Sequence, residues 1–389
     1  MTSSKGPILV HVTTVPETLG FFRGQISYMK GRGFEVHAVS SPGKLLEEVA
    51  TREAISVHAV DLPRRITPFL DLLSLLKLYQ LFTVLKPNIV HGHTPKGGLL
   101  AVIAARLASV PVVFYTIHGL PFTTAKGMKR YLLCWTEKLA CLLADRVFAV
   151  SRANKRDAVA QGFCHKNKIH LLAAGSCNGV DSEARFNPEK LAPGVRDALR
   201  NSCHIPADAL VLGYIGRIVQ DKGIATLAEA WQYLRQQDTD LYLLMVGPEE
   251  PQDPLPTAVL TRLKADPRVI FSGGVGNPIP FYSAMDILIL PTYREGFPIV
   301  PLEAAAMQLS VIATNVDGCS EAVQDGITGL LVPPRDPQAL GAAMERLILD
   351  PELRRQMGRA GRQRVLQEFR PEAIWEALYE NYMEFLKIS

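Results

Sequence analysis

Cysteine is scarce in this sequence, and its spacing matches neither a metal site nor a disulfide framework. The six cysteines are Cys134, Cys141, Cys164, Cys177, Cys203 and Cys319. No Cys-x-x-Cys pair occurs among them, whereas structural zinc sites and disulfide-rich scaffolds depend on closely spaced cysteines. We therefore expect free thiols and a reducing compartment, the cytoplasm.

A large excess of charge is also absent. Lysine and arginine total 42 against 38 aspartates and glutamates, which gives a formal net charge of +4. This balance argues against nucleic acid as a partner, but it allows an anionic ligand or an anionic membrane surface. The first residues, from Met1 to Gly6, include no apolar run, so we expect no signal-peptide core ahead of the first strand.

Apolar residues, by contrast, are abundant. They make up 48% of 389 residues, enough for a sizeable core in two domains or one large one. Short apolar runs predict strands and longer periodic segments predict helices. The predicted strands are 7–12, 34–39, 55–60, 86–93, 111–116, 146–151, 169–172, 209–215, 240–246, 269–273, 286–290, 310–314 and 329–332. The predicted helices are 21–31, 69–85, 94–107, 125–144, 302–307, 336–350, 351–369 and 371–388.

One turn stands out because two carboxylates, Glu295 and Glu303, flank it between the strand 286–290 and the helical run 302–307. Ligands of open α/β sheets bind at the carboxyl ends of strands, and amides at a helix start favour an anion. The turn therefore predicts a site for a ligand that carries both phosphate and sugar hydroxyls. The backbone expected to face this ligand is that of Gly296, Phe297, Pro298, Ile299 and Val300.

Two further blocks occur with this turn along the chain. They are Gly213-Tyr214-Ile215-Gly216-Arg217 followed by Asp221-Lys222-Gly223, and the run from Asn315 to Gly329. Together with the spacing of Glu295 and Glu303, they resemble the family 4 glycosyltransferases across nearly the whole chain. The resemblance implies an α/β fold of the GT-B type, with two doubly wound (Rossmann-like) domains facing a central cleft. The implied boundaries are 1–178 for the acceptor-binding domain, 179–370 for the nucleotide-sugar domain, and 371–389 for a final helix that returns to the first domain.

The resemblance also implies roles for particular residues. Arg217 and Lys222, beside Gly216, would hold the diphosphate and stabilise charge on the leaving nucleotide. Glu303 would bind the ribose, and Glu295 with the backbone of residues 296–300 would orient the donor sugar. The turn 274–277, with Val275, resembles the loop that binds the base. No metal or other cofactor is implied, because the two cations can neutralise the diphosphate.

Three histidines, His91, His93 and His118, follow or end neighbouring predicted strands. A lone histidine is usually structural, but three at one rim of a sheet favour a site. A zinc site is not expected, since no His-x3-His pair or cysteine cluster accompanies them. The resemblance places His118 near the donor sugar and diphosphate among the catalytic residues, with Arg217, Lys222 and Glu295, and it places His93 on the acceptor side. No catalytic nucleophile is implied.

Two helices carry surface patterns with more than one interpretation. The helix 69–85 has apolar residues around most of its circumference, which fits a helix packed on the sheet, or one partly exposed to a membrane interface or a second subunit. The helix 125–144 interleaves Lys126, Lys129 and Arg130 with aromatic residues such as Trp135. This pattern fits either a membrane interface or a solvated helix that also carries core residues.

The predicted function is transfer of a sugar from a nucleotide sugar, expected to be a UDP-sugar, to a lipid-linked or polysaccharide glycan. The resemblance implies that the transfer retains the anomeric configuration. One alternative is a GT-B sugar-nucleotide epimerase, and another is a non-catalytic module that binds nucleotide sugars. The intact set of Arg217, Lys222, Glu295 and Glu303 argues against a module that has lost activity. The expected location is the cytoplasm, at the inner face of the cytoplasmic membrane if the protein docks there.

Overall fold

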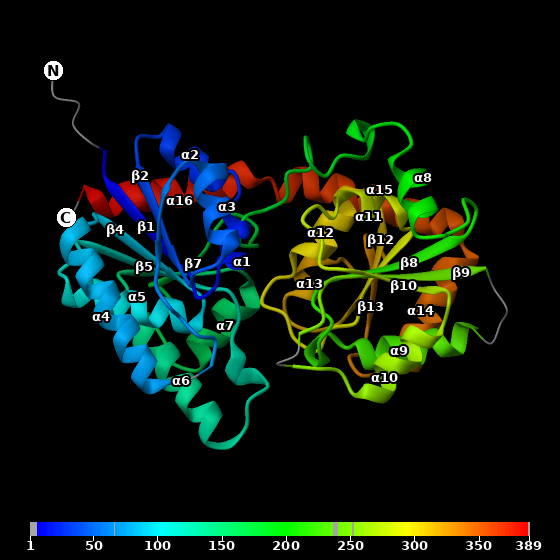
Figure 1. The fold of residues 1–389 in the computed structure, drawn as a ribbon, viewed down its shortest axis with the longest axis horizontal. Helices are drawn as coiled ribbons and strands as arrows, with labels where there is room; N and C mark the ends of the chain where they lie inside the picture. Colours follow the sequence, from blue (N-terminus) through cyan, green and yellow to red (C-terminus); the bar gives the residue numbers. More distant parts are fainter. Residues whose placement is uncertain (1–5, 66, 236–239, 251–252, 388–389) are drawn as a thin grey trace. The chain divides into compact units, whose positions relative to one another are not determined.

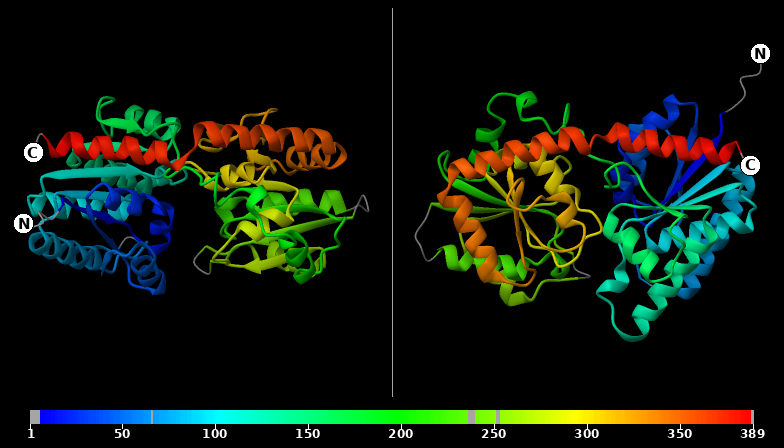
Figure 2. Two further views of the ribbon diagram at one scale, coloured as in Figure 1. Left: turned by 90° about the horizontal axis from the view of Figure 1, so that it is seen from above. Right: turned by 180° about the vertical axis from the view of Figure 1, so that it is seen from behind.

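The computed structural model describes residues 6–65, 67–235, 240–250 and 253–387, and it separates into two compact units (Figure 1). Unit 1 comprises Met1–Gly179 together with Pro371–Ser389, and unit 2 comprises Val180–Arg370. The chain therefore passes from unit 1 to unit 2 between Gly179 and Val180, and it returns at Pro371, where the last helix begins. Each unit is a parallel sheet with helices on both faces (Figures 1 and 2).

The sheet of unit 1 has seven parallel strands in the order β3-β2-β1-β4-β5-β6-β7. Its strands are β1 (Ile8–Val12), β2 (Glu35–Ser40), β3 (Ser56–Ala59), β4 (Ile89–His93), β5 (Val112–Ile117), β6 (Arg146–Ala149) and β7 (Ile169–Leu171). Because β1 lies between β2 and β4, the order of strands reverses there. This reversal is the switch point at which open α/β sheets bind ligands.

The helices of unit 1 form two cores, one on each face of the sheet. They are α1 (Pro16–Leu19), η1 (Gly20–Phe22), α2 (Gln25–Gly31), α3 (Lys44–Glu53), α4 (Pro68–Leu85), α5 (Pro95–Leu107), η2 (Pro121–Thr123), α6 (Gly127–Leu143), α7 (Arg152–Ala160) and α16 (Pro371–Leu386). Val10 and Val90 face the core with α4, α5 and α6, whereas Leu9 and Ile89 face the core with α2, α3 and α16. Alternate strand residues thus point to opposite faces, and the apolar strands are covered on both sides.

The prediction of one helix over 21–31 is wrong. The segment folds as the short turns α1 and η1, and α2 begins only at Gln25. Gly24 interrupts the helix with a φ of +81°, and a β-carbon added there would lie only 2.5 Å from the ring of Trp375. Only glycine adopts this backbone beside the ring at low cost.

The helix α4 buries only one line of side chains. Ser74, Leu78 and Phe82 face the core, while large apolar side chains such as Phe69 (74% exposed) and Val84 (83% exposed) lie on the surface. Among the described residues, α4 alone is long and apolar enough to cross a membrane, and 17% of it is buried. Leu75, Leu81 and Leu85 are partly buried against the same core. Packing in unit 1 therefore covers one side of α4 and leaves the side with Phe69 and Val84 exposed.

The sheet of unit 2 has six parallel strands in the order β10-β9-β8-β11-β12-β13. Its strands are β8 (Leu210–Ile215), β9 (Leu241–Val246), β10 (Val269–Gly273), β11 (Ile287–Leu290), β12 (Ser310–Thr314) and β13 (Gly329–Val332). With β8 between β9 and β11, the strand order again reverses at the first strand. The thirteen strands of the two sheets match the predicted ones to within three residues at either end.

Helices again cover the sheet of unit 2. They are η3 (Pro188–Lys190), α8 (Val195–Ser202), η4 (Gln220–Lys222), α9 (Ile224–Arg235), α10 (Thr257–Ala265), α11 (Ile279–Ala284), α12 (Ile299–Ala306), α13 (Cys319–Ala322), α14 (Pro337–Leu349) and α15 (Pro351–Glu368). The helical run predicted over 302–307 starts three residues earlier, because Pro298 takes the extended conformation at the N-cap of α12. This brings the start of α12 close to Glu295.

Candidate active site

The three motif blocks of unit 2 follow β8, β11 and β12, which are adjacent in the sheet. Their turns pack closely through glycines. A β-carbon at Gly223 (φ +69°) would meet the carbonyl oxygen of Pro291 at 1.8 Å, and one at Gly318 (φ +83°) would meet that of Gly296 at 2.6 Å. The glycines therefore let the flanking turns press against the end of β11, at the switch point of the sheet.

Three ion pairs join the loops at this edge, and one of them links Arg294 to Asp221 at 2.9 Å. The ammonium group of Lys222 donates to the carboxylate of Glu295, and both side chains are largely buried. The guanidinium of Arg217 donates to Glu250, which follows β9. The structure thus brings Lys222 and Glu295 together from separate motif blocks, whereas Arg217 is the more exposed cation of this edge and has an acidic partner of its own.

The start of α12 offers fewer amide donors than its length suggests. Pro298 and Pro301 have no N–H group, and the N-cap residue makes no side-chain capping bond. The amides that remain for a ligand are those of Phe297, Ile299 and Val300. Uncapped amides at a helix start suit an anionic or hydroxyl oxygen.

Glu303 lies within α12 and is held by Tyr282 of α11. The Tyr282 hydroxyl donates to the carboxylate at 2.7 Å. Burial raises the pKa of Glu303 above its usual range, and the hydrogen bond from Tyr282 works in the opposite direction. Burial beside this carboxylate also raises the pKa of Tyr282, so the phenol is the donor of the pair. The remaining oxygen can accept hydrogen bonds from hydroxyl groups.

Val275 lies in the turn between β10 and α11, where it is partly exposed. The turn follows the carboxyl end of a strand, like the other loops of the edge, but β10 is the outermost strand on its side of the sheet. Val275 is therefore placed on the same edge as Arg217 and Lys222, with β9 between its strand and β8.

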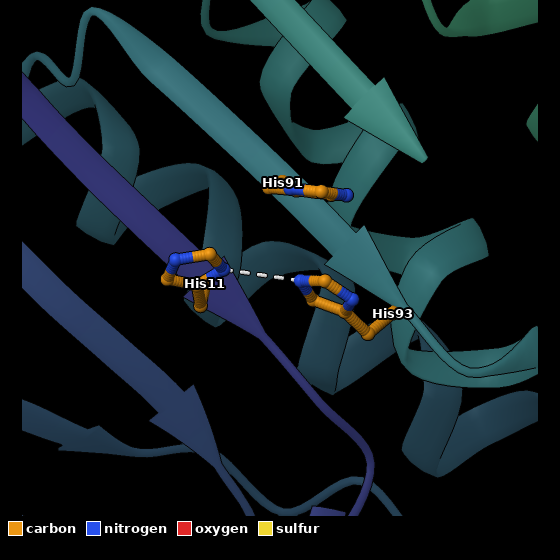
Figure 3. Close-up of side chains that lie close together, drawn as sticks. All are labelled: His11, His91 and His93. Carbon is orange, nitrogen blue, oxygen red and sulfur yellow. Dashed lines mark hydrogen bonds between the residues drawn. The ribbon is translucent and has the colours of Figure 1, made fainter. Parts of the chain in front are cut away.

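The histidines of unit 1 converge at the other switch point. His11 is paired in register with His91, and His93 ends β4 beside Thr116 of β5. These residues and His118 share the face that carries η1 and α16, because they occupy alternate positions of their strands. Figure 3 shows the rings of His11, His91 and His93 close together, with a hydrogen bond between His11 and His93.

Every ring nitrogen of His91 and His93 has a partner. The Nδ1 and Nε2 atoms of His91 lie 2.6 Å from the Tyr382 hydroxyl and 2.7 Å from that of Thr116. Those of His93 lie 3.1 Å from His118 and 3.0 Å from His11. Burial lowers the pKa of His11 and of His118 to about 4, and it lowers the pKa of His91 and His93 well below the usual value. The histidines are thus neutral near pH 7.

His118 and His93 differ in their access to a ligand. His118 follows β5, is partly exposed and lines a cavity of about 20 Å³ together with Phe22, Gln25 and Ser176, which is room for roughly one water molecule. His93 also lines the cavity, but it is 2% exposed and both its nitrogens are occupied. As placed, His93 reaches a ligand only through His118.

Sequence reasoning missed several partners of the predicted residues. His11 is the second-last residue of β1. Once β1 is paired with β4, its position shows that its side chain lies on the same face of the sheet as those of His91 and His93. Tyr282, Glu250 and Tyr382 lie far along the chain from the groups they contact, and no local pattern marks them. The group of His11, His91 and His93 has ligand atoms within 4.8 Å of one another, a spacing that could hold a metal ion; the expectation of no metal stays a prediction.

Two family models match the chain. One, described as glycosyl transferases group 1, matches residues 195–364, and the other, a glycosyl transferase 4-like domain, matches residues 21–175. A capsular polysaccharide biosynthesis glycosyltransferase, CapM of Staphylococcus aureus, is 36% identical over 386 residues and covers 99% of each chain. A UDP-Gal:α-D-GlcNAc-diphosphoundecaprenol α-1,3-galactosyltransferase of Escherichia coli is 27% identical, with 88% of each chain covered.

Solved structures share the fold. A glycosyltransferase from Rickettsia africae has a TM-score of 0.79 at 23% identity and covers 99% of this chain and all of its own, 100%. HepE of Anabaena, solved with UDP, has a TM-score of 0.78 at 20% identity, over 97% of this chain and 100% of its own.

The fold and the relatives together define a nucleotide-sugar glycosyltransferase with the GT-B fold. The chain belongs to the family 4 glycosyltransferases, as the three motif blocks indicated.

Proposed function

We propose that this enzyme transfers a sugar from a UDP-sugar, with retention of configuration, to a lipid-linked glycan during the assembly of a surface polysaccharide. The relatives support the acceptor class, since one is named for capsule synthesis and another for a diphosphoundecaprenol acceptor. A structural neighbour solved with UDP supports the nucleotide. The main support for the donor site is that the three motif blocks converge at the switch point of unit 2, beside β8 and β11.

On the donor side, Lys222 and Arg217 hold the diphosphate and Glu303 accepts hydrogen bonds from the ribose. The contact between Lys222 and Glu295 supports this arrangement, because it brings a phosphate-binding cation beside the carboxylate that orients the sugar. The diphosphate would bind Lys222 and Arg217 either in place of their carboxylate partners, Glu295 and Glu250, or together with them. Val275 contacts the base.

On the acceptor side, neutral His118 contacts the sugar or the reacting centre from unit 1. A neutral imidazole can donate or accept a hydrogen bond without adding charge. No nucleophile is assigned. The leaving phosphate, stabilised by Arg217 and Lys222, would assist attack by the acceptor hydroxyl.

The donor is tested by calorimetric titration with UDP, GDP and ADP and their sugars, followed by mass spectrometry of products with polyprenyl-diphosphate glycans. We expect binding of UDP and a product heavier by one sugar. Conversion of the nucleotide sugar without an acceptor would instead identify an epimerase, and binding without any product from lipid-linked or soluble glycans would favour a non-catalytic module.

We further propose that unit 1 docks peripherally on an anionic membrane through α4 and α6. Both helices pack against α5 on one face of the sheet. The exposed apolar side chains of α4 are joined by Met128 (84% exposed) and Tyr131 (73% exposed) of α6, next to the exposed cations Lys126, Lys129 and Arg130. An apolar surface with basic neighbours suits a lipid interface.

Liposome co-sedimentation tests this docking. Each cation near an anionic surface contributes about 1 kcal/mol, so Lys126→Ala/Lys129→Ala/Arg130→Ala should weaken binding to phosphatidylserine vesicles strongly at low salt. A matched variant, Arg262→Ala/Lys264→Ala/Arg359→Ala, removes the same charge from exposed positions of unit 2 and should bind normally. Equal losses in both variants, or no binding by the unmodified protein, would rule out docking through this surface.

A further inference from the structure

Three histidines of unit 1 form a continuous chain of ring-to-ring hydrogen bonds. His11 Nδ1 lies 3.0 Å from His93 Nε2, and His93 Nδ1 lies 3.1 Å from His118 Nε2. The chain runs from the interior of the sheet at β1, through the end of β4, to the partly exposed ring that follows β5. Its inner end is the Nε2 atom of His11, which is buried and has no hydrogen-bond partner among the described residues.

Only two proton arrangements satisfy both bonds when all three rings are neutral, since a neutral imidazole has one N–H donor and one acceptor nitrogen. In the first, each ring carries its proton on Nδ1, so His11 donates to His93 and His93 donates to His118. In the second, each ring carries its proton on Nε2 and the bonds run in the opposite direction. The two arrangements differ at both ends of the chain. The first leaves an acceptor at His11 Nε2 and a donor at His118 Nδ1, and the second exchanges these roles.

The inner end distinguishes the two arrangements. In the first, the buried Nε2 of His11 is an unpaired acceptor, and in the second it is an unpaired N–H donor beside the stacked ring of Phe22. In the protein backbone, buried N–H groups without a partner are rarer than carbonyl oxygens that lack one, and we apply the same preference to the imidazole. The first arrangement is therefore favoured, and the other end of the chain then presents the Nδ1–H of His118.

We propose that His11 and His93 are positioning residues that hold neutral His118 with its proton on Nδ1, so that His118 donates a hydrogen bond to an oxygen of the bound sugar or acceptor. This inference rests on the proposed function only in placing His118 at the ligand. Burial, which keeps the rings neutral, supports it. The fixed tautomer means that His118 does not take up a proton from the attacking hydroxyl at this atom.

A metal ion is the competing explanation for the cluster. It would need unprotonated nitrogens from His11, His91 and His93 directed at one point. His91, however, already has an oxygen at hydrogen-bond distance from each nitrogen, Tyr382 on one side and Thr116 on the other. The structure therefore favours the hydrogen-bonded chain.

The test is nuclear magnetic resonance of the full chain with nitrogen-15 in its histidines. Long-range proton–nitrogen correlations identify the tautomer of each ring, and couplings across the hydrogen bonds identify bonded pairs. Signals are assigned by their loss in His11→Leu, His93→Leu and His118→Leu. We expect Nδ1–H on all three rings and couplings from His11 to His93 and from His93 to His118. Protonation on Nε2, double protonation, or one bound metal per chain by elemental analysis would overturn the proposal.

A kinetic measurement separates this inference from the proposed function. In His93→Leu we expect a population of His118 protonated on Nε2, and a fall in kcat of roughly tenfold, as for one lost polar contact. His165→Leu, at an exposed histidine of the same unit, should change neither. If the His118 tautomer changes in this variant but kcat does not, the positioning of His118 by His93 is supported and the role of His118 in the reaction is refuted. A His118 tautomer unchanged in His93→Leu would refute positioning. Should His93→Leu fail to fold, the tautomers of the unmodified protein decide the question.

Discussion

Both units carry polar side chains at the switch point of their sheet, but the side chains are charged in one unit and neutral in the other. The switch point of unit 2 carries ionised groups in pairs, Lys222 with Glu295 and Arg217 with Glu250. The switch point of unit 1 carries neutral imidazoles packed in the interior. Paired charges near solvent can exchange partners with an incoming phosphate, whereas buried neutral rings hold one geometry. One fold can thus present exchangeable charged pairs in one unit and a fixed cluster of neutral hydrogen-bonding rings in the other.

Acid should affect the two units differently, and this is the largest effect we expect. The pKa of His11 falls from 6.5 to about 4 on folding, so between these pH values the unfolded chain binds more protons and stability decreases as the pH falls. For His11 alone the shift corresponds to on the order of 3 kcal/mol, and the other buried histidines of unit 1 act in the same direction.

Glu137 opposes this trend within unit 1. Burial raises its pKa from 4.5 to about 7, so its contribution to stability increases as the pH falls through that window. One such carboxyl does not offset several histidines. In unit 2 the raised pKa of Glu303 also favours the folded state at lower pH. Hydrogen exchange followed by mass spectrometry, corrected for intrinsic rates, should show unit 1 opening before unit 2 between pH 6.5 and 4. Equal protection of both units would contradict the contrast.

Removing the cations of unit 2 should give the next largest effect. Lys222→Ala and Arg217→Ala should each weaken UDP binding about 10- to 150-fold, because a hydrogen bond to a charged group contributes about 1.5–3 kcal/mol. Calorimetry measures the loss, and uridine, which lacks phosphates, should bind almost as before.

The matched control for these variants is Lys264→Ala. Lys264 is also an ion-paired lysine of unit 2, joined to Glu249 at 2.6 Å, but it belongs to α10 and to none of the three motif blocks. Its loss should leave UDP binding unchanged. Equal weakening of UDP and uridine in Lys222→Ala would remove the diphosphate assignment.

Tyr282→Phe should have a smaller effect that depends on pH. The substitution removes the hydrogen bond that lowers the pKa of Glu303, so that pKa should rise further. In the proposed role the ionised carboxylate accepts the ribose hydroxyls, so UDP binding should weaken as the pH falls, and the midpoint should lie higher in the variant. At high pH we expect about a fivefold loss, for roughly 1 kcal/mol per hydrogen bond. Calorimetry across pH measures this shift, and a pH profile identical to that of the unmodified protein would exclude Glu303 as the ribose acceptor.

Much of the fold followed from local patterns, because buried parallel strands are short apolar runs that few other elements imitate. The turn from Arg294 to Glu303 was also visible, since its carboxylates follow such a strand directly. The break at Gly24 was not, because an isolated glycine does not reveal that its φ is positive, and the ring of Trp375 that crowds it comes from a distant part of the chain. Contacts between side chains far apart in the sequence, such as that of Tyr382 with His91, also leave no local pattern in the sequence.

The surface of α4 shows a different limit. Its apolar composition could not distinguish a core helix from a partly exposed one, because both bury a stripe and only the neighbours decide how wide that stripe is. The structure shows that only Ser74, Leu78 and Phe82 are buried. The described residues of unit 1 leave the apolar side chains on the other side of α4 exposed, and the liposome experiment tests whether a membrane covers them.

The smallest expected effect is that of a chelator, and it tests both sites together. Sugar transfer should persist in EDTA, because Arg217, Lys222 and the amides of α12 would take the place of a metal at the diphosphate. Loss of activity with EDTA and its return with magnesium would instead place a cation beside the phosphates in unit 2, as for an octahedral ion bound mainly by substrate oxygens. Return only with zinc would direct attention to the histidines of unit 1, since imidazole nitrogens are ligands zinc prefers. Repeating the zinc experiment with His11→Leu separates these cases: a metal held by the cluster would no longer restore activity, whereas a metal held by the diphosphate would restore it as before.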